Sequence, residues 1–271
     1  MKSQMTQAAA NVIDRVRQTR PLIHSITNYV TVNDVANILL SFGAAPAMVE
    51  TFDEAYDFAQ FSSALYLNLG TLPPEQEAAG VQAVLGAGAS GRPVVVDPVA
   101  LGAVPRKERV LNHLLRVSKP AIIKGNGGEI LSLAGVAGAT RGVDAVGELA
   151  GLEESAVESA RRLGCVIAAT GPTDIVTDGT RLVQVHNGHE LLTKVTGTGC
   201  MAGALVAAAA AVETDPLVAA VAGIMAMGIA GELAAKVAAL PGSFRIALID
   251  STYQLTTAKV AELGRIDVRS V

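Results

Sequence analysis

The 271-residue sequence has few aromatic side chains, few charges and no tryptophan. Aromatic residues make up 3% and charged residues 17% of the chain, and the formal net charge is −4. Because no basic run is present, the chain lacks the electrostatic footprint of a nucleic-acid-binding protein. Only two cysteines occur, Cys165 and Cys200, which excludes a disulfide framework and a cysteine-based metal cluster.

The abundant residues are small and aliphatic, and apolar residues make up 50% of the chain. Two stretches, 195–212 and 216–231, carry no charge and are long enough to suggest a membrane hairpin. Alanine and glycine are only weakly lipophilic, however, and neither stretch has a basic flank or an aromatic belt. We therefore expect buried core helices and no membrane span. Residues 1–20 are interrupted by charges and lack an apolar core, which predicts no signal peptide and a cytoplasmic protein.

Short apolar runs that resemble strands alternate with helical patterns along the chain. Strands of this kind, apolar throughout, are typical of a parallel sheet covered by helices on both faces. A hairpin is expected from 174–177 to 182–185 through Asp178-Gly179. We predict one α/β domain over 1–271 with a mostly parallel central sheet. The four runs are 65–69, 94–96, 121–123 and 166–169.

Helix boundaries are predicted from local signals. Thr51 and Glu54 have the spacing of a capping box, which predicts a helix start. From Gly199 onward the pattern is nearly all helical, with two alanine-rich helices separated by 213–216 and a last helix after Asp250.

Polar residues follow several of the expected strands, and in a parallel sheet such positions meet at one edge, where ligands bind. We therefore expect them to converge on one crevice. They are Asn68, Asp97, the segment 124–129 and the segment 170–174.

The stretch Thr196-Gly197-Thr198-Gly199-Cys200, before the first alanine-rich helix, has several interpretations. It opens a G-x-G-x-x-A pattern, but a dinucleotide site needs a second strand and an acid about 20 residues on. That spacing reaches Glu213 and Asp215, in a turn between helices. The G-x-G-x-x-G pattern at 86–91 precedes a strand, so it also fails, and no Walker-type loop is present.

The two glycines of this stretch are compatible with an anion site and with a simple tight turn. Gly197 and Gly199 allow the backbone to approach a ligand closely, and free N–H groups at a helix start attract anions. Cys200 would lie in the first helical turn, where the helix dipole lowers the pKa of a thiol. A cysteine nucleophile also needs a histidine base, and no motif assigns one of the four histidines to that role. Cys165 is expected to be core.

The segment from Lys124 to Glu129 combines a lysine, three glycines and an acid. This composition suits phosphate contact and magnesium positioning, because Mg²⁺ binds one or two carboxylates together with water and phosphate. An alternative is a helix start at which Asn126 and Glu129 form a capping box. Asp97, between a strand and a proline, has a turn-capping role as its alternative.

Taken together, these patterns resemble the ribokinase-like superfamily, and within it the hydroxyethylthiazole kinase family. The N-x-x-E pattern at 126–129 and the glycine-rich loop that opens a late helix carry the superfamily resemblance. The family resemblance covers nearly the whole chain and rests on the segments 21–48, 65–72, 94–103, 119–130, 193–204 and 241–250.

The resemblance implies a ribokinase-like fold without a separate lid domain. It implies that ATP and Mg²⁺ are used to phosphorylate the hydroxyl of 4-methyl-5-(2-hydroxyethyl)thiazole in thiamine salvage. A kinase of this fold that acts on another small alcohol, a sugar or hydroxymethylpyrimidine, is the alternative. The family also implies a homotrimer with active sites at subunit interfaces. Different reaction classes, a cysteine-dependent hydrolase and a non-catalytic nucleotide-binding protein, remain alternatives from the residues alone.

The resemblance further implies roles for individual residues. Lysine at 124 departs from the family's usual arginine, and it keeps the charge but loses the planar two-pronged contact. The superfamily usually has aspartate, the general base, where this chain has Cys200. The implied catalytic residues are Gly197, Thr198, Gly199 and Cys200; the substrate contacts are Asn28, Met48, Gly197 and Cys200; the nucleotide contacts are Lys124, Asn126, Thr170 and Gly171; and the residues near the metal are Asp97 and Glu129.

Overall fold

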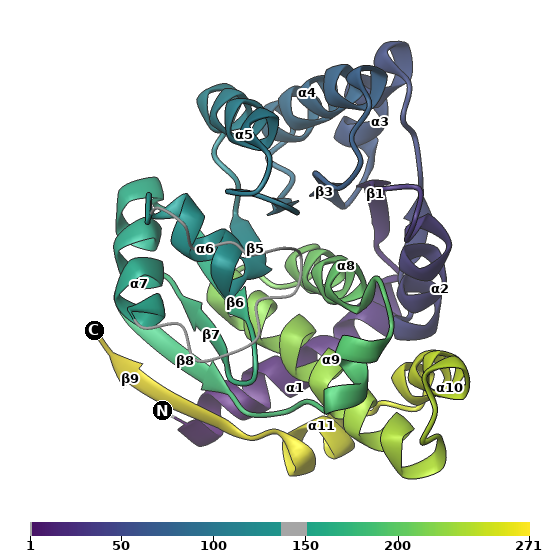
Figure 1. Cartoon of the computed structure of the whole chain (residues 1–271). Coiled ribbons are helices and arrows are strands. Elements are labelled where there is room, and N and C mark those ends of the chain that lie inside the picture. The colour runs from purple at the N-terminus through teal and green to yellow at the C-terminus, as the bar shows by residue number, and fades with distance from the viewer. Residues whose placement is uncertain (1, 137–150) are drawn as a thin grey trace.

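The computed structural model describes residues 2–136 and 151–271 (Figure 1). The strands in these ranges are β1 (Leu22–Ile26), β2 (Ala45–Ala47), β3 (Ala64–Asn68), β4 (Val94–Asp97), β5 (Ile122–Asn126), β6 (Val166–Thr170), β7 (Asp174–Thr177), β8 (Arg181–Val185) and β9 (Ile266–Ser270). They form one sheet in the order β2-β1-β3-β4-β5-β6-β7-β8-β9. All neighbours from β2 to β6 in this order are parallel, and β7, β8 and β9 extend the sheet with antiparallel pairing.

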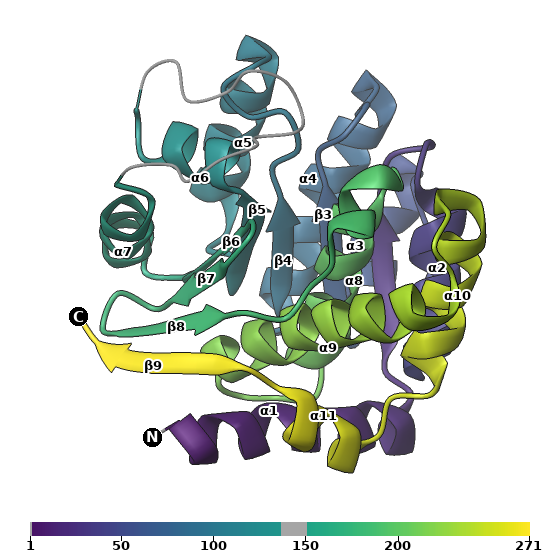
Figure 2. The same cartoon turned by 60° about the horizontal axis from the view of Figure 1, so that its bottom comes forward.

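Helices cover both faces of the sheet, as predicted (Figures 1 and 2). The helices of one face are α3 (Phe52–Phe61), α4 (Pro74–Ala89), α5 (Pro105–Val117), α6 (Gly127–Leu133) and α7 (Leu152–Leu163). Those of the other face are α1 (Lys2–Thr19), α2 (Val32–Phe42), α8 (Thr198–Ala210), α9 (Pro216–Val237), α10 (Pro241–Tyr253) and α11 (Thr257–Leu263).

The alternation of side chains along the strands divides the core in two. In β3, Leu65 and Leu67 belong to the core beneath α4, whereas Tyr66 belongs to the core beneath α8. This follows from the two-residue period of a strand, which sends successive side chains to opposite faces. Because both faces are buried, the strands read as continuous apolar runs.

The two uncharged stretches form core helices, as predicted. In the described part of the chain, α9 is the one helix long and apolar enough to cross a membrane. Of its most apolar 18-residue stretch, 89% is buried inside the protein. The small residues of α8 and α9 allow these helices to pack closely on each other and on the sheet.

Two local helix predictions were confirmed in part. The last helix, α11, does follow Asp250, but Asp250 itself lies within α10, which was not predicted. The final strand β9, which pairs antiparallel with β8, was also not predicted. Thr51 is the N-cap residue of α3, which confirms the predicted helix start. The capping box is absent, because the Thr51 hydroxyl donates to the Glu54 carboxylate at 2.6 Å and its oxygen accepts no N–H group from the helix backbone. The hairpin through Asp178-Gly179 is confirmed.

The parallel register brings the polar strand ends together, as predicted. Asn68 at the end of β3 pairs with Asp97 at the end of β4. Asn126 at the end of β5 pairs with Thr170 at the end of β6. The N-terminus of α8 approaches the same edge of the sheet over β3 and β4.

Candidate active site

The start of α8 is built around Gly197, its N-cap residue. Gly197 has φ +87°, a conformation that side chains with a Cβ rarely adopt. A Cβ added there would also lie 2.8 Å from the Thr31 methyl carbon. The first backbone bond of the helix runs from the Met201 N–H to the Gly197 carbonyl at 2.8 Å. The N–H groups of the preceding helical residues therefore face outward, which favours a bound anion.

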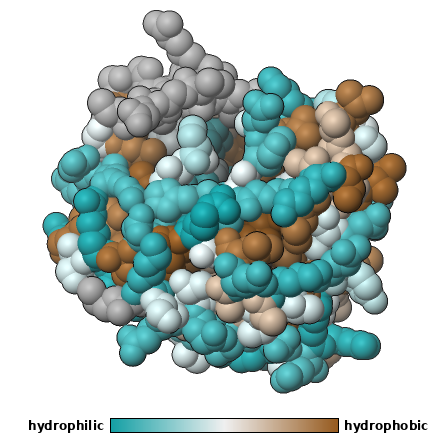
Figure 3. All heavy atoms as spheres, turned by 90° about the horizontal axis from the view of Figure 1, so that it is seen from below, coloured by the Kyte–Doolittle hydropathy of each residue, from teal (hydrophilic) through white to brown (hydrophobic). Residues whose placement is uncertain are grey.

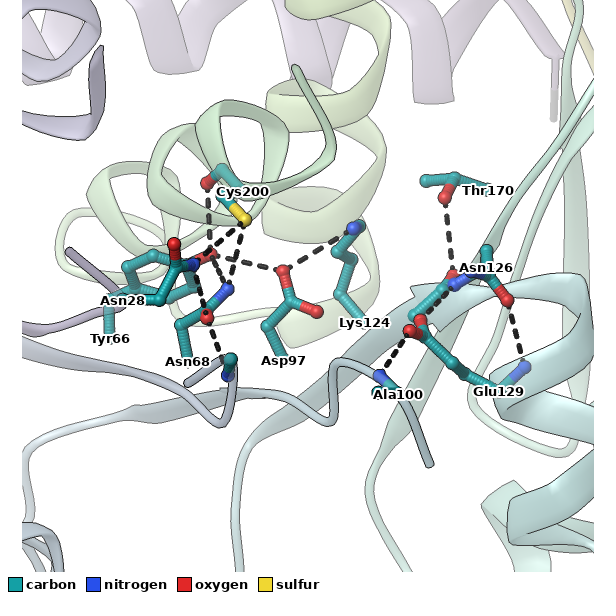
Figure 4. A network of polar contacts seen from close by, with 12 residues as sticks. Asn28, Tyr66, Asn68, Asp97, Ala100, Lys124, Asn126, Glu129, Thr170 and Cys200 are labelled. Carbon is teal, nitrogen blue, oxygen red and sulfur yellow. Dashed lines mark hydrogen bonds and ion pairs between the residues drawn. The ribbon is translucent and has the colours of Figure 1, made fainter. Parts of the chain in front are cut away.

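A buried ion pair lies against this helix start. The Lys124 ammonium is 3.4 Å from Asp97 Oδ2, and both side chains are almost fully buried (Figure 4). The same Nζ would lie 3.3 Å from a Cβ at Gly199, so a larger residue there would crowd the ammonium. A fixed positive charge and free helix N–H groups thus converge where phosphoryl oxygens could bind.

The protonation of this pair is set by burial and by mutual charge. Burial lowers the pKa of Lys124, but the carboxylates of Asp97 and Glu129 outweigh burial and raise it, so the amine stays charged. Burial raises the pKa of Asp97, and Lys124 and Tyr66 oppose the shift. Asp97 Oδ1 is buried and has no hydrogen-bond partner in the described part of the chain.

The Cys200 sulfur accepts hydrogen bonds from two amide side chains. Asn68 Nδ2 lies 3.2 Å and Asn28 Nδ2 3.6 Å from Sγ, and Asn28 Nδ2 also donates to Asn68 Oδ1 at 3.0 Å (Figure 4). The prediction that the helix start lowers the thiol pKa was wrong. Burial and the charge of Asp97 raise the pKa of Cys200, against the opposing effect of Lys124.

A neutral thiol is therefore the expected state of Cys200. In residues 2–136 and 151–271, which contain all four histidines, no histidine contacts its sulfur. The cysteine-nucleophile interpretation thus has neither a thiolate nor a base.

The segment from Asn126 to Glu129 forms the capping box that was the alternative to a metal site. The Asn126 side chain accepts from the Glu129 N–H at 2.9 Å, and Glu129 Oε2 accepts from the Asn126 N–H at 2.7 Å. Glu129 Oε1 accepts from the N–H of Ala100, which has a left-handed φ of +64°. Burial, reinforced by Asp97, raises the pKa of Glu129 to about 7.

The end of β6 supplies Thr170, Gly171 and, at the start of β7, Asp174. The Thr170 hydroxyl donates to the Gly125 carbonyl at 3.3 Å, and the Gly171 N–H donates to Asp174 Oδ1 at 2.9 Å. These contacts join the edges of β5, β6 and β7 and leave Gly171 exposed at the surface.

Asp174 gives the protein a testable pH dependence. Burial raises its pKa from 3.8 to about 7, against the Gly171 N–H and Lys124. The folded state therefore holds a proton that the unfolded state releases, so this contribution to stability is complete below about pH 4 and is lost as pH rises towards 7. The unfolding free energy of the wild type should fall by about 2–4 kcal/mol over this pH range because of Asp174, and Asp174→Asn should lack this fall. Urea unfolding at a series of pH values measures the difference. An unchanged pH dependence in the variant would show that Asp174 is ionised in the folded protein.

The structure gathers most, but not all, of the predicted site residues. Asn28 contacts Cys200, and Lys124 contacts Asp97. Tyr66 joins these two pairs into one hydrogen-bonded group, with the glycines at the start of α8 beside it. Asn126, Glu129 and Thr170 form a second group at the ends of β5 and β6. The Thr198 hydroxyl turns away and donates to the Leu192 carbonyl at 2.8 Å. Met48 follows β2 and packs against the core beneath α8.

Sequence reasoning noted Asn68 only as a polar strand end, and it missed Tyr66. The Tyr66 hydroxyl contacts Asp97, Cys200 and Asn68, although the residue lies inside an apolar strand. No local signal distinguishes such a tyrosine from an ordinary core residue.

The larger of two hollows described in the protein lies at the opposite edge of the sheet. It has a volume of about 770 Å³ and is lined by residues that precede β4, β5 and β6, such as Pro93, Pro120 and Cys165. It contains none of the predicted site residues. The hollow and the predicted site residues therefore lie at opposite edges of the sheet. The converging charges and the start of α8 are the stronger indication of an active site.

The parallel sheet, its antiparallel extension and the charged group at the start of α8 are those of a ribokinase-like kinase. A sequence model of the hydroxyethylthiazole kinase family matches residues 13–258, and the chain belongs to this family.

Similar proteins agree with this assignment. The chain is 52% identical over 257 residues to hydroxyethylthiazole kinase 2 of Clostridium botulinum (strain Loch Maree / Type A3), covering 95% of this chain and 98% of that protein. It is 48% identical to the hydroxyethylthiazole kinase of Clostridium novyi (strain NT), covering 93% and 95% of the two chains. The solved hydroxyethylthiazole kinase protein of Pyrococcus horikoshii OT3 superposes with a TM-score of 0.87 at 37% identity, over 97% of this chain and 98% of that one.

A more distant structure shares the fold alone. The pyridoxal kinase of Staphylococcus aureus, solved with AMP-PCP and pyridoxal, superposes with a TM-score of 0.60 at 15% identity, over 93% of this chain and 99% of that one.

Proposed function

We propose that this chain transfers the γ-phosphoryl group of ATP to the hydroxyl of 4-methyl-5-(2-hydroxyethyl)thiazole, a step of thiamine salvage. Family membership over residues 13–258 supports the reaction. The structural observation that carries the proposal is the buried Lys124–Asp97 pair, which lies against the glycine-opened start of α8 and beside Cys200. We further propose that the chain acts as one kinase domain, since its described strands form one sheet.

Positioning and electrostatics supply most of the acceleration in phosphoryl transfer, because the transition state is loose. We assign stabilisation of the transferred group to the N–H groups at the start of α8 and to the ammonium of Lys124. Both are fixed before substrate binds, the first by the turn at Gly197 and the second by Asp97. Preorganised donors of this kind need no rearrangement as charge develops.

The acceptor alcohol is assigned to the Cys200 side of this group, with Asn28 and Met48 as further contacts. Because Asn28 and Asn68 direct N–H groups at Sγ, the sulfur is held in place and its own hydrogen is available to orient a hydroxyl. The raised pKa of Cys200 argues against an early role as a base. Lys124, Asn126, Thr170 and Gly171 are assigned to the nucleotide side.

The residues present fit a magnesium ion that is shared with phosphate and water. In the described part of the chain, no group of three or more His, Cys, Asp or Glu side chains could hold a metal by itself. Asp97 has a free buried oxygen, and both Glu129 oxygens already accept backbone N–H groups. We assign Asp97 and Glu129 as the residues that would hold the ion, with the free oxygen on Asp97. Bound Mg²⁺ would supply neutralisation of phosphate charge.

A homotrimer with active sites at subunit interfaces is part of the proposal, and so is a cytoplasmic location. Support for the trimer comes from large apolar side chains at the surface, among them Tyr29, beside Asn28, at 75% exposed and Leu240 at 71%. Figure 3 shows one face of the molecule, on which hydrophobic areas lie between hydrophilic side chains. Burial of such surface between subunits would be favourable.

ADP release in the presence of ATP, Mg²⁺ and a panel of alcohols tests the proposed reaction. We expect turnover with the thiazole alcohol and much slower turnover with sugars and hydroxymethylpyrimidine. Faster turnover with another alcohol would overturn the substrate assignment. An absence of ADP release with every alcohol would overturn the kinase assignment.

Cys200→Ala tests the role given to the thiol. Removing a group that orients the alcohol, and not an essential base, is expected to lower kcat by about 10- to 100-fold. The Kd for ATP should stay within about twofold, because the nucleotide contacts are assigned elsewhere. Steady-state kinetics and ATP titration measure the two effects. Full activity in the variant would show that Cys200 has only a packing role.

A further inference from the structure

Tyr66 is a fully buried tyrosine in the middle of β3, and its ring lies under the first turns of α8. Space for its hydroxyl is made by Gly203. A Cβ at Gly203 would lie 2.7 Å from the Tyr66 oxygen and 2.8 Å from a ring carbon. The helix therefore approaches the strand closely at the point where the phenol points towards the site.

The Tyr66 oxygen has three polar neighbours and one hydrogen to donate. It lies 3.0 Å from Asp97 Oδ2 and 2.9 Å from the Cys200 carbonyl, and it accepts from Asn68 Nδ2 at 3.1 Å (Figure 4). Two acceptors thus share a single O–H group. One belongs to β4 and the other to the first turn of α8, so the phenol links the two elements that carry the charged site.

The same oxygen helps to direct the side chain of Asn68. The Gly70 N–H donates to Asn68 Oδ1 at 2.9 Å, which fixes which end of the amide is the acceptor. The two hydrogens of Nδ2 then go to Tyr66 and, at 3.2 Å, to the Cys200 sulfur. Asn68 has all its donors in use, and the phenol holds one of them.

We propose that Tyr66 is a positioning residue for phosphoryl transfer, whose hydroxyl aligns the first turn of α8 and the Cys200 thiol with Asp97. The expected effect of Tyr66 on activity rests on the proposed function, whereas its effect on the position of Cys200 does not. Without the hydroxyl, the Cys200 carbonyl and one Asn68 hydrogen lose their shared partner. The start of α8 would then be free to shift relative to β4.

Tyr66→Phe removes this oxygen and keeps the ring. We expect kcat for the thiazole alcohol to fall about tenfold while the KM values for ATP and alcohol stay within about twofold, since misalignment affects the transition state more than binding. We also expect iodoacetamide to alkylate Cys200 several-fold faster. Mass spectrometry of the labelled peptide separates Cys200 from Cys165, whose pKa burial raises to about 11.

Thr252→Val is the matched control for loss of a buried hydroxyl. Thr252 is fully buried in α10 and donates to the Leu248 carbonyl at 2.8 Å, away from the site. The Thr252→Val variant should lower the melting temperature, as Tyr66→Phe does, but should leave kcat and the rate of Cys200 alkylation unchanged. Tyr66→Leu is a second hydroxyl-free variant, and it should show at least the same fall in kcat.

The proposal is overturned if Tyr66→Phe is folded and both kcat and the Cys200 alkylation rate stay within twofold of the wild type. The hydroxyl would then serve stability alone. If the wild type phosphorylates none of the alcohols, the proposed function fails, and the alkylation rates still decide whether Tyr66 positions Cys200.

Discussion

Lys124→Met is expected to lower kcat/KM for ATP by about 100- to 1,000-fold, because it removes the fixed charge assigned to the transferred phosphoryl group. It also leaves the carboxylate of Asp97 buried without its cation. Removing one member of a buried pair costs about 3–5 kcal/mol of unfolding free energy. Steady-state kinetics and urea unfolding measure the two losses independently.

The double variant Lys124→Met/Asp97→Asn is the control that separates these losses. With the unpaired charge removed, most of the stability should return, whereas the activity should not. Lys124→Arg keeps the charge, but its larger head has little room beside Gly199, where the lysine nitrogen lies 3.3 Å from the Cβ position. We expect an intermediate activity. A methionine variant with wild-type kcat/KM would remove Lys124 from the phosphoryl site.

Gly197→Ala is expected to lower kcat/KM by about 100-fold or more, because the N–H groups at the start of α8 would lose their alignment. The alanine would have to adopt φ +87°, and its Cβ would lie 2.8 Å from the Thr31 methyl carbon. The left-handed conformation alone costs about 1–2 kcal/mol. Kinetics with ATP and the thiazole alcohol, together with urea unfolding, test both statements.

Gly135→Ala is a matched control, since Gly135 also has φ +87° but no atom of the described residues lies within 4 Å of its Cβ position. It should show the same backbone cost and normal activity. If the two variants lose activity equally, backbone strain and not the geometry of α8 would explain the effect at Gly197. If Gly197→Ala keeps full activity, the turn serves only chain reversal.

Much of the fold could be predicted from local patterns. Apolar runs such as 94–96 and 166–169 are strands, Asp178-Gly179 turns a hairpin, and the uncharged stretches are core helices. These features depend on neighbouring residues, whose periodicity and turn chemistry are visible in one segment. The final strand β9 was missed because its partner β8 lies far away along the chain, and only the pairing reveals it.

Convergence of the site residues could also be predicted, because the carboxyl ends of parallel strands meet at one edge. The sequence by itself thus determined which strand ends carry polar groups and where a glycine turn opens a helix. Tertiary structure alone decided the state of Cys200, since burial and Asp97 outweigh the helix start and raise its pKa. It also decided the role of Tyr66, which meets Cys200 across 134 positions of the chain. Burial and long-range contact are properties of the packed chain, and no local pattern of residues encodes them.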